Sequence, residues 1–409
     1  MRKHILRELG LSVSIVVLFV VLGASTSVRA DFPVIQTLDS GLNVGLWSSL
    51  ELDSSGHPRM SYYHQDGTNT SLKYAAWNGT SWALETVDSR AGAGGFNSLE
   101  LDSSGNPHIS YKRTVSVWYV GTTQYIDAAL EYAAWNETES EWDIETADNG
   151  DRNVGNNSSL ALDSSDDPYI AHYWLWPDGN DLVYTYRDGS SWSDQMVDNG
   201  SQGVVGPSLA LDSSDKPHIS YYDIDSGGLK YGVRNGSSWA FQLLDSASQA
   251  GGYDTSLALD SSGYPHISYI VGSDPRLKYA WWDPTLNSGA GDWDITTVDS
   301  VTKAYQSTSL ALDGSGYPHI GYYDYTNQEV KYAAWDGSSW GIETVDWVGG
   351  MGQDISLALD SRGFAHISYY DASNSGLKYA NNTPELSTLL LLVLGLPAAA
   401  AVRRRKRES

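Results

Sequence analysis

One segment recurs seven times along this chain of 409 residues. It follows the pattern Ser-Leu-Ala-Leu-Asp-Ser-Ser-Gly-x-Pro-His-Ile-Ser-Tyr-Tyr-Asp, with some substitution in every copy. Neighbouring copies begin 47 to 61 residues apart, as measured from their first aspartate at Asp53, Asp102, Asp163, Asp212, Asp260, Asp313 and Asp360. A repeat of this length is one supersecondary unit that buries its apolar side chains only against its neighbours.

Each repeat predicts four short β-strands. The first is represented by Ser256–Leu259 and the second by His319–Tyr323, with the tight Asp-Ser-Ser-Gly turn between such strands. The third and fourth are represented by Leu72–Trp77 and Trp82–Asp88. Asn-Gly or Asp-Gly joins them in several copies, and these dipeptides favour hairpins because both turn residues adopt positive φ. Four strands in about 50 residues, without a helical pattern, predict one blade of a β-propeller.

The ends of the repeat array predict how the blades close. The seventh copy stops after Leu377–Ala380 and lacks a fourth strand, whereas Val34–Asp39 resembles one. We therefore expect an all-β fold. It is a seven-bladed β-propeller of four-stranded antiparallel blades over residues 31–382, in which the N-terminal strand completes the last blade. Such closure removes exposed sheet edges.

Residues 1–30 read as a signal peptide. Arg2, Lys3 and Arg7 precede the apolar run Leu11–Leu22, and the small-residue site Val28–Ala30 follows. The apolar run is shorter than the roughly 20 residues of a membrane-spanning helix. The sequence thus predicts export, with an uncleaved membrane anchor as the alternative.

Residues 383–409 form a second targeting segment. Pro384 and Glu385 precede an apolar run to Val402, which a basic cluster follows at Arg403–Arg407. This order resembles the PEP-CTERM and PEF-CTERM sorting signals of prokaryotes, and Leu386 as the third motif residue leaves the subfamily open. The resemblance implies processing by an exosortase or archaeosortase. A plain transmembrane anchor is the alternative. The basic cluster stays cytoplasmic in either case, which places the propeller on the cell surface.

Composition excludes several partners and sites. The chain has no cysteine, so it can form neither a disulfide nor a thiolate metal site. Its formal charge is −25, from 25 basic and 50 acidic side chains. Residues 1–30 and 385–409 hold nine of the basic and three of the acidic ones, so the remainder carries −31. Such a surface disfavours nucleic acid and anionic lipid.

The repeated turns and the variable loops predict opposite roles for the two ends of the blades. The turns after the first and third strands are nearly uniform, which indicates a structural face. The other loops vary, and variable loops on a rigid scaffold commonly carry function. We therefore expect ligand-binding residues where second strands reach the variable loops, with blade packing and turn capping as the alternative. The candidates are Tyr63, His64, Tyr222, Asp223, Tyr323, Asp324, Tyr370 and Asp371.

Two other recurring side chains predict structure and not metal chemistry. An aspartate that opens a tight turn accepts hydrogen bonds from nearby backbone N–H groups, and one carboxylate per blade does not supply the six to eight oxygens that calcium takes. The histidine before Ile-Ser-Tyr gives way to Arg59 and Tyr169 in two copies, which does not suit a ligand. We predict no metal site or cofactor. The binding of calcium at an acidic rim formed by the fourth-strand aspartates is the alternative.

Part of the repeat resembles that of propeller lectins, including fucose-binding ones. The shared features are Tyr-Tyr on the second strand, an aromatic third strand and Trp-Asn/Asp-Gly-x-x-Trp. The resemblance implies a sugar held by an arginine and a glutamate between blades. Here the corresponding second-strand position is mostly histidine, and the third strand mostly carries lysine, with Glu131 alone acidic.

The sequence thus favours an exported, surface-anchored binding or adhesion propeller. Its ligand would be a glycan, an envelope polymer or another protein. A secreted propeller glycoside hydrolase or lyase and a structural cell-envelope component are the alternatives. No catalytic residue is assigned, since 47 acidic side chains are too many candidates for the carboxylate pair that a glycosidase uses.

Overall fold

The computed structural model describes residues 32–149, 153–176, 179–199, 203–246, 254–271, 276–300, 307–349 and 354–384. These residues form twenty-eight β-strands and one short helix. The predicted signal peptide, Glu385 and the rest of the predicted tail lie outside the described residues. Within these ranges no helix is long and apolar enough to cross a membrane.

The strands group into seven four-stranded antiparallel units in chain order. Unit 1 contains β2 (Leu46–Leu52), β3 (Pro58–Asp66), β4 (Asn69–Trp77) and β5 (Trp82–Asp88). Unit 2 contains β6 (Gly95–Leu101), β7 (Pro107–Val120), β8 (Thr123–Asn136) and β9 (Glu141–Asp148). Unit 3 contains β10 (Asn153–Leu162), β11 (Pro168–Trp176), β12 (Gly179–Asp188) and β13 (Ser191–Asn199).

The later units follow the same plan. Unit 4 contains β14 (Val204–Leu211), β15 (Pro217–Asp223), β16 (Gly228–Asn235) and β17 (Ser238–Asp245). Unit 5 contains β18 (Thr255–Leu259), β19 (Pro265–Val271), β20 (Arg276–Asp283) and β21 (Asp292–Ser300), with α1 (Leu286–Gly289) between the last two. Unit 6 contains β22 (Thr308–Leu312), β23 (Pro318–Asp324), β24 (Glu329–Trp335) and β25 (Trp340–Trp347).

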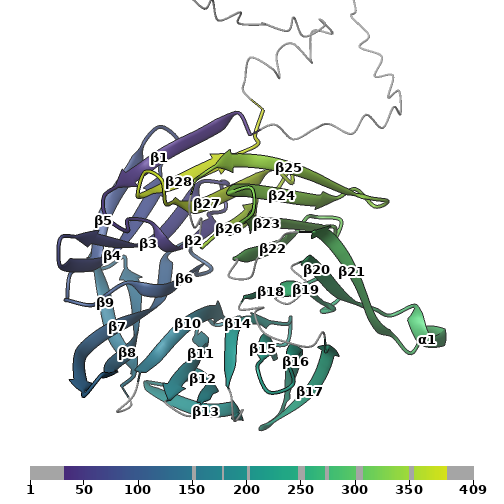
Figure 1. Ribbon diagram of the computed structural model, residues 1–409, viewed down its shortest axis with the longest axis horizontal. Coiled ribbons are helices and arrows are strands. Elements are labelled where there is room, and N and C mark those ends of the chain that lie inside the picture. Colours follow the sequence, from purple (N-terminus) through teal and green to yellow (C-terminus); the bar gives the residue numbers. More distant parts are fainter. Residues whose placement is uncertain are drawn as a thin grey trace, which may run out of the picture.

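Unit 7 combines the two ends of the described chain. It contains β26 (Ser356–Leu359), β27 (Ala365–Asp371), β28 (Gly376–Asn381) and, as its fourth strand, β1 (Val34–Ser40). Strand β1 runs antiparallel to β28, with Val34 opposite Asn381 (Figure 1). The all-β fold of four-stranded antiparallel sheets is therefore confirmed, and the N-terminal strand occupies the fourth position that the last repeat lacks.

The units follow one another around a common centre. First strands lie nearest the centre of Figure 1 and fourth strands lie at its rim. A single parallel pairing, between Asn153 and Ala128, links units 2 and 3 into one eight-stranded sheet. The apolar core is divided into seven clusters, each formed by two successive units. One of them joins Leu50 and Met60 of unit 1 to Leu377 of unit 7.

A hydrogen bond between neighbouring first strands recurs at every junction. The serine hydroxyl of one unit accepts the backbone N–H of a leucine in the next unit, at about 3 Å. The junction between units 7 and 1 uses the same bond as the others. The serine–leucine pairs are Ser49–Leu99, Ser98–Leu160, Ser159–Leu209, Ser208–Leu257, Ser256–Leu310, Ser309–Leu357 and Ser356–Leu50.

An aspartate at the end of the fourth strand joins that strand to the next unit. Its Oδ2 accepts hydrogen bonds from a second-strand tyrosine and a third-strand lysine of the following unit. At the junction of units 6 and 7, Asp346 lies 2.8 Å from the Tyr369 hydroxyl and 2.7 Å from the Lys378 Nζ. The other such sets are Asp39–Tyr62–Lys73, Asp198–Tyr221–Lys230, Asp245–Tyr269–Lys278 and Asp299–Tyr322–Lys331.

An edge-to-face aromatic contact recurs nearer the rim. The tryptophan that opens a fourth strand packs against the third-strand tyrosine of the preceding unit, with ring centroids 5.2 to 5.6 Å apart. Unit 7 has no such tryptophan, and Phe32, just before β1, packs against Tyr332 in the same geometry at 5.5 Å. The N-terminal segment therefore supplies both the strand and the ring that the last repeat lacks.

The antiparallel course of the strands gives the units two ends. We call the end with the turns after first and third strands the turn face, and the opposite end the loop face. The turn-face aspartates act as expected, since Asp53 Oδ1 accepts the backbone N–H groups of Ser55 and His57 at 2.9 Å, and the other six repeats do the same. The chain also leaves at the turn face, where Asn382 exchanges hydrogen bonds with Ala365.

Replacing Lys378 with methionine tests the junction. Lys378 also bonds the Asp371 carboxylate at 2.8 Å, so the variant leaves Asp346 and the buried Asp371 without their shared cation. Removing one partner of a buried ion pair costs about 3–5 kcal/mol. We expect a loss of that size in the free energy of unfolding, measured by denaturant titration. The control is Lys216→Met, since the ion pairs of unit 4 within the described residues are those of His218 and Lys230 and do not include Lys216. An equal, small loss in both variants would contradict a supporting role for the junction.

Candidate functional site

The structure places most of the predicted site residues inside the units. Tyr323 and Tyr370 are buried, as are Asp223, Asp324 and Asp371. The Asp371 carboxylate accepts hydrogen bonds from the Ser373 backbone N–H and the Asn374 side chain, and so caps the loop that follows. Although burial alone would raise the pKa of Asp371, hydrogen bonds from Lys378, Ser373 and Asn374 lower it to about 2. This carboxylate therefore holds the loop and the Lys378 ammonium.

Asp223 and Asp324 cap their own loops in the same way. Tyr63 and His64 are partly exposed at the loop face of unit 1. The eight predicted residues come from four units, and five of them are buried. The fourth-strand aspartates, expected as a rim, instead bind tyrosine and lysine at five junctions.

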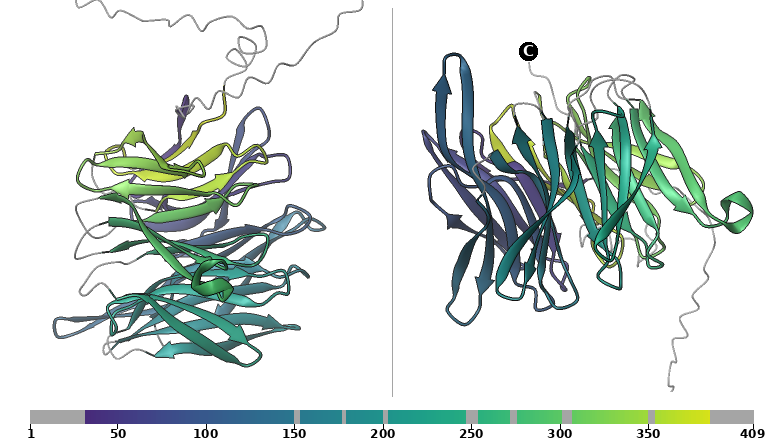
Figure 2. Two further views of the ribbon diagram at one scale, coloured as in Figure 1. Left: turned by 90° about the vertical axis from the view of Figure 1, so that its right-hand side faces the viewer. Right: turned by 90° about the horizontal axis from the view of Figure 1, so that it is seen from below.

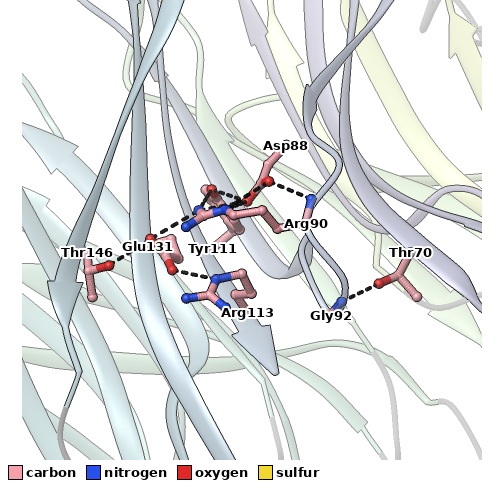
Figure 3. Close-up of polar contacts among 8 residues, drawn as sticks. All are labelled: Thr70, Asp88, Arg90, Gly92, Tyr111, Arg113, Glu131 and Thr146. Carbon is pink, nitrogen blue, oxygen red and sulfur yellow. Dashed lines mark hydrogen bonds and ion pairs between the residues drawn. The ribbon is translucent and has the colours of Figure 1, made fainter. Parts of the chain in front are cut away.

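In unit 2 the acidic and basic residues of the second and third strands are exchanged. In units 4, 6 and 7 the second strand ends in an aspartate that pairs with the third-strand lysine, as Asp371 pairs with Lys378. In unit 2 the corresponding residues are Arg113 and Glu131, and Arg113 Nε lies 2.6 Å from Glu131 Oε1 (Figure 3). Glu131 is fully buried and accepts a further hydrogen bond from Thr146. The ion pair is kept, but the cation now belongs to β7 and the anion to β8.

Arg90 compensates for the lysine that unit 2 lacks. Asp88, the fourth-strand aspartate of unit 1, would otherwise face Glu131 without a cation. The Arg90 guanidinium bonds Asp88 through two nitrogens at 2.8 and 3.0 Å and reaches Glu131 at 3.2 Å (Figure 3). Although burial opposes it, hydrogen bonding from Arg90 lowers the pKa of Asp88. Two arginines therefore lie together at this junction.

Bulky aromatic rings lie next to this junction in a strained backbone. Trp47 and Phe96 precede the first-strand serines of units 1 and 2, where the pairing of each strand is irregular. Their φ values are 52° and 49°, a left-handed conformation that large side chains rarely adopt. Their ring centroids lie 4.6 Å apart, and the Lys112 Nζ lies 5.5 Å from the Phe96 ring. Such strain persists where the surrounding structure imposes it, often at functional sites.

The junction of units 2 and 3 brings together Asp148, His172 and Asp194, whose potential metal-binding atoms lie within 4.8 Å of one another. Their hydrogen bonds form a directed chain. The Gly155 N–H donates to Nδ1 of His172, so Nε2 carries the proton and donates to the Thr185 hydroxyl, which donates to Asp194. Burial lowers the pKa of His172 to about 4, which keeps it neutral. Both ring nitrogens are engaged, so this arrangement does not offer a histidine ligand to a metal.

An extended hairpin explains the longest repeat spacing. Strands β7 and β8 have fourteen residues each and project beyond the neighbouring sheets at the loop face (Figure 2). Near the tip, Trp118 is 47% exposed and stacks on Tyr125. The extra residues of the second repeat therefore add a projecting aromatic surface and not another strand.

Two cavities on the turn face lie between successive units. The cavity between units 7 and 1 has a volume of about 270 Å³, and that between units 4 and 5 about 370 Å³. Each has two tryptophans from the later unit along one side. In the first cavity these are Trp77 and Trp82, and in the second Trp282 and Trp293.

The two cavities are built from the same repeat positions. In each, a histidine, a tyrosine and a glutamine of the earlier unit face a glycine, an aromatic residue, a proline and two tryptophans of the later unit. The glutamine accepts the indole N–H of the fourth-strand tryptophan, at 3.1 Å for Trp82 and 2.8 Å for Trp293. The equivalent pairs are His366 with His218, Tyr379 with Tyr231, Gln36 with Gln242, Pro58 with Pro265, Trp77 with Trp282 and Trp82 with Trp293.

His366 has a free ring nitrogen at the first cavity. Its Nδ1 is hydrogen-bonded to the Tyr379 hydroxyl at 2.5 Å, while its buried Nε2 has no hydrogen-bond partner. In units 2, 4, 5 and 6 the turn aspartate lies 3.5 to 3.9 Å from the equivalent nitrogen, whereas Asp360 is bonded by Arg362. The sequence signal for these cavities is the pair of tryptophans that flank the turn between the third and fourth strands. The uniformity of these turns across the repeats predicts a structural face.

No protein-family model matches this chain, and no curated protein sequence does. Solved structures match its fold. The polysaccharide lyase Uly1 is 9% identical, with 88% of this chain and 93% of that chain covered and a TM-score of 0.53. A protein of unknown function from Dyadobacter fermentans is 9% identical, with coverages of 86% and 98% and a TM-score of 0.52. A triple arginine mutant of AofleA from Arthrobotrys oligospora is 13% identical, with coverages of 79% and 95% and a TM-score of 0.50. These likenesses establish a propeller-like all-β fold.

The buried histidine makes stability depend on pH. Burial lowers the pKa of His366 to about 4, whereas a histidine in an unfolded chain has a pKa near 6.5. The unfolded chain therefore binds the proton first, and stability present above pH 6.5 is lost as the pH falls toward 4. We expect His366→Phe to reduce this loss by at most about 1.4 kcal/mol per pH unit, as measured by denaturant unfolding at several pH values. Tyr379→Phe, which keeps the titrating group, should retain the wild-type slope. Equal slopes in wild type and His366→Phe would contradict the assignment.

Proposed function

We propose that the seven units are the blades of one closed β-propeller, and that this propeller is an exported, surface-anchored glycan-binding module. Closure is supported by the junction of units 7 and 1, which repeats the contacts of the others. It has the serine–leucine hydrogen bond, the aspartate–tyrosine–lysine set and the tryptophan–tyrosine contact. A ring of blades whose last sheet is completed by the N-terminal strand accounts for all three.

The pair of equivalent cavities is the observation that carries the binding proposal. Two cavities built from the same repeat positions at different junctions point to one repeated binding site. Binding sites for small ligands combine apolar walls with a few fixed polar groups. The tryptophan rings supply the apolar walls, while the glutamine amide and the histidine ring supply polar atoms. Volumes of about 270 and 370 Å³ fit one or two sugar rings per site.

Aromatic walls suit a sugar because one face of a pyranose ring is lined with C–H groups. Such a face stacks on an aromatic ring, and the hydroxyl groups at the ring edge take hydrogen bonds. At the first cavity the Gln36 side chain, which accepts the Trp82 indole N–H, supplies a polar group at the wall. A weak single site gains avidity when several sites engage one polymer, because the later binding events become intramolecular. Repetition around the ring is therefore an advantage for a polymeric ligand.

The predicted export signal and C-terminal sorting signal belong to the same proposal. Residues 1–30 direct export, and Pro384 and Glu385 begin a sorting segment for an exosortase or archaeosortase. Because the chain leaves at the turn face, an anchored propeller turns the inter-blade cavities toward its own cell envelope. We therefore favour a glycan of that envelope as the ligand over a glycan of a distant surface.

A glycan array probed with the full-length protein in detergent tests the proposal. The double variant Trp77→Ala, Trp282→Ala removes one wall from each cavity, and we expect at least a tenfold lower affinity for a bound glycan, equivalent to about 1.4 kcal/mol. The matched control is Trp118→Ala, which removes an exposed tryptophan from the loop-face hairpin.

The outcomes separate the candidate functions. If Trp118→Ala abolishes binding and the cavity variant does not, the glycan site lies on the loop face. If no glycan binds, with or without calcium, the binding proposal fails and a structural envelope role gains support. Shortened or unsaturated products from a bound polymer would instead indicate a hydrolase or a lyase.

A further inference from the structure

We propose that the projecting hairpin of β7 and β8 is a self-association surface, through which two copies of this chain pair with their turn faces pointing apart. The surface is formed by Val117, Tyr119 and Ile126 on one side of the hairpin and by Trp118 and Tyr125 on the other. It shares no residue with the turn-face cavities. The pairing does not depend on the proposed function, and only its use between facing cells rests on the proposed anchoring.

The hairpin exposes apolar side chains on both of its faces. Val117 lies directly opposite Ile126, and Tyr119 follows two residues later on the same face, since side chains alternate along a strand. Val117 is 46% exposed and Tyr119 is 65% exposed. Trp118 lies opposite Tyr125 on the other face and is 47% exposed. A contiguous exposed apolar surface of this kind marks an interaction site.

The outer part of the hairpin also has unpaired backbone edges. Strand β6 pairs with β7 only as far as Lys112, and β9 pairs with β8 only from Leu130 onward. In the described part of the chain, the edges beyond these residues carry a single strand pairing, between Ala128 and Asn153 near the base. The N–H and C=O groups of such edges can bond another strand.

The hairpin lacks the charges that normally keep such edges apart. Residues 114–126 contain no charged side chain, although the chain between residues 31 and 384 carries a formal charge of −31. The outer strand of the same unit, β9, has exposed carboxylates at Glu141, Asp143 and Glu145. Natural edge strands commonly carry charged side chains that prevent pairing with another chain. Their absence here leaves this edge open to pairing.

The partner that fits this surface best is a second copy of the same chain. Two strongly acidic molecules repel each other over most of their surfaces, so the uncharged hairpin is where they can approach. A hairpin edge is self-complementary, because two copies related by a two-fold axis present the same residues to each other. Segments that bind a membrane surface combine apolar with basic side chains, and residues 114–126 contain no lysine or arginine.

The direction of the hairpin determines how two paired copies lie. The hairpin extends from the loop face (Figure 2), whereas the chain leaves β28 at the turn face. Antiparallel pairing therefore places the two turn faces at opposite ends of the dimer. Copies anchored in two facing cell surfaces need this arrangement. Because one hairpin offers few residues, adhesion between cells would come from many such pairs acting together.

Charge placed on the hairpin tests the pairing. We expect wild type to dimerise in sedimentation equilibrium of the full chain in detergent. The double variant Val117→Glu, Tyr119→Glu brings like charges together, so its dissociation constant for self-association should rise at least about tenfold, equivalent to about 1.4 kcal/mol. Mixing this variant with Val117→Lys, Tyr119→Lys should restore pairing as a heterodimer. All variants should keep the wild-type melting temperature, because these side chains are exposed.

The matched control is Leu84→Glu, Ile342→Glu, which adds the same charge at exposed positions of β5 and β25. It should associate as wild type does. Raising the salt concentration from about 0.05 to about 0.5 M should strengthen the wild-type dimer, because salt screens the repulsion between two acidic molecules. Vesicles that carry the anchored full chain should cluster, and vesicles that carry the glutamate variant should not.

Several outcomes would overturn the proposal. These are a monomeric wild type, a glutamate variant that associates as tightly as wild type, and a mixture of oppositely charged variants that does not pair. Binding of wild type to protein-free vesicles of neutral lipid, lost in the glutamate variant, would identify a membrane as the partner instead. Dimers without vesicle clustering would contradict the facing arrangement. Trp77→Ala, Trp282→Ala should lose the turn-face glycan and keep self-association, so the two proposals fail independently.

Discussion

Partly or fully buried carboxylates at the ends of the fourth strands hold neighbouring units in register. Each needs a partner, since an unpaired charge that is withdrawn from water is destabilising. In five units the compensation is a tyrosine and a lysine of the next unit. This requirement links three strands from two units, so none of the three residues can change alone. It explains why the same residue types recur through repeats whose loops differ widely.

Unit 2 shows how that requirement is met when the repeat changes. Glu131 replaces the lysine, and Arg113 and Arg90 restore the balance for Glu131 and Asp88. Unit 3 follows another route, with the neutral His172 in place of the tyrosine and a hydroxyl chain to Asp194. The departures therefore lie in adjacent units. They alter the charge that each unit presents to solvent while the backbone of the sheet is preserved.

The strands and the place of β1 could be predicted because turn dipeptides and alternating side chains mark each strand locally. The site could not be predicted to the same degree. Sequence places Asp371 and Tyr370 at the end of a second strand, but it does not show that Lys378 and the Ser373 N–H bond the buried Asp371 carboxylate. Nor does it show that Trp77 and Trp82 face His366 of another unit, since that contact crosses the whole length of the chain. The uniform turns predict a structural face, and a repeated binding site would be uniform too.

The place of β28 in unit 7 has a mechanical consequence. The chain continues toward its C-terminal segment from this strand, which lies between β27 and β1 and is paired on both sides. Tension applied through the tail therefore pulls along the strand, and two hydrogen-bonded ladders resist it together in shear. A tail attached to an outermost strand would instead be peeled away one bond at a time. The N-terminal strand thus acts as a clamp on the point where load would enter the protein.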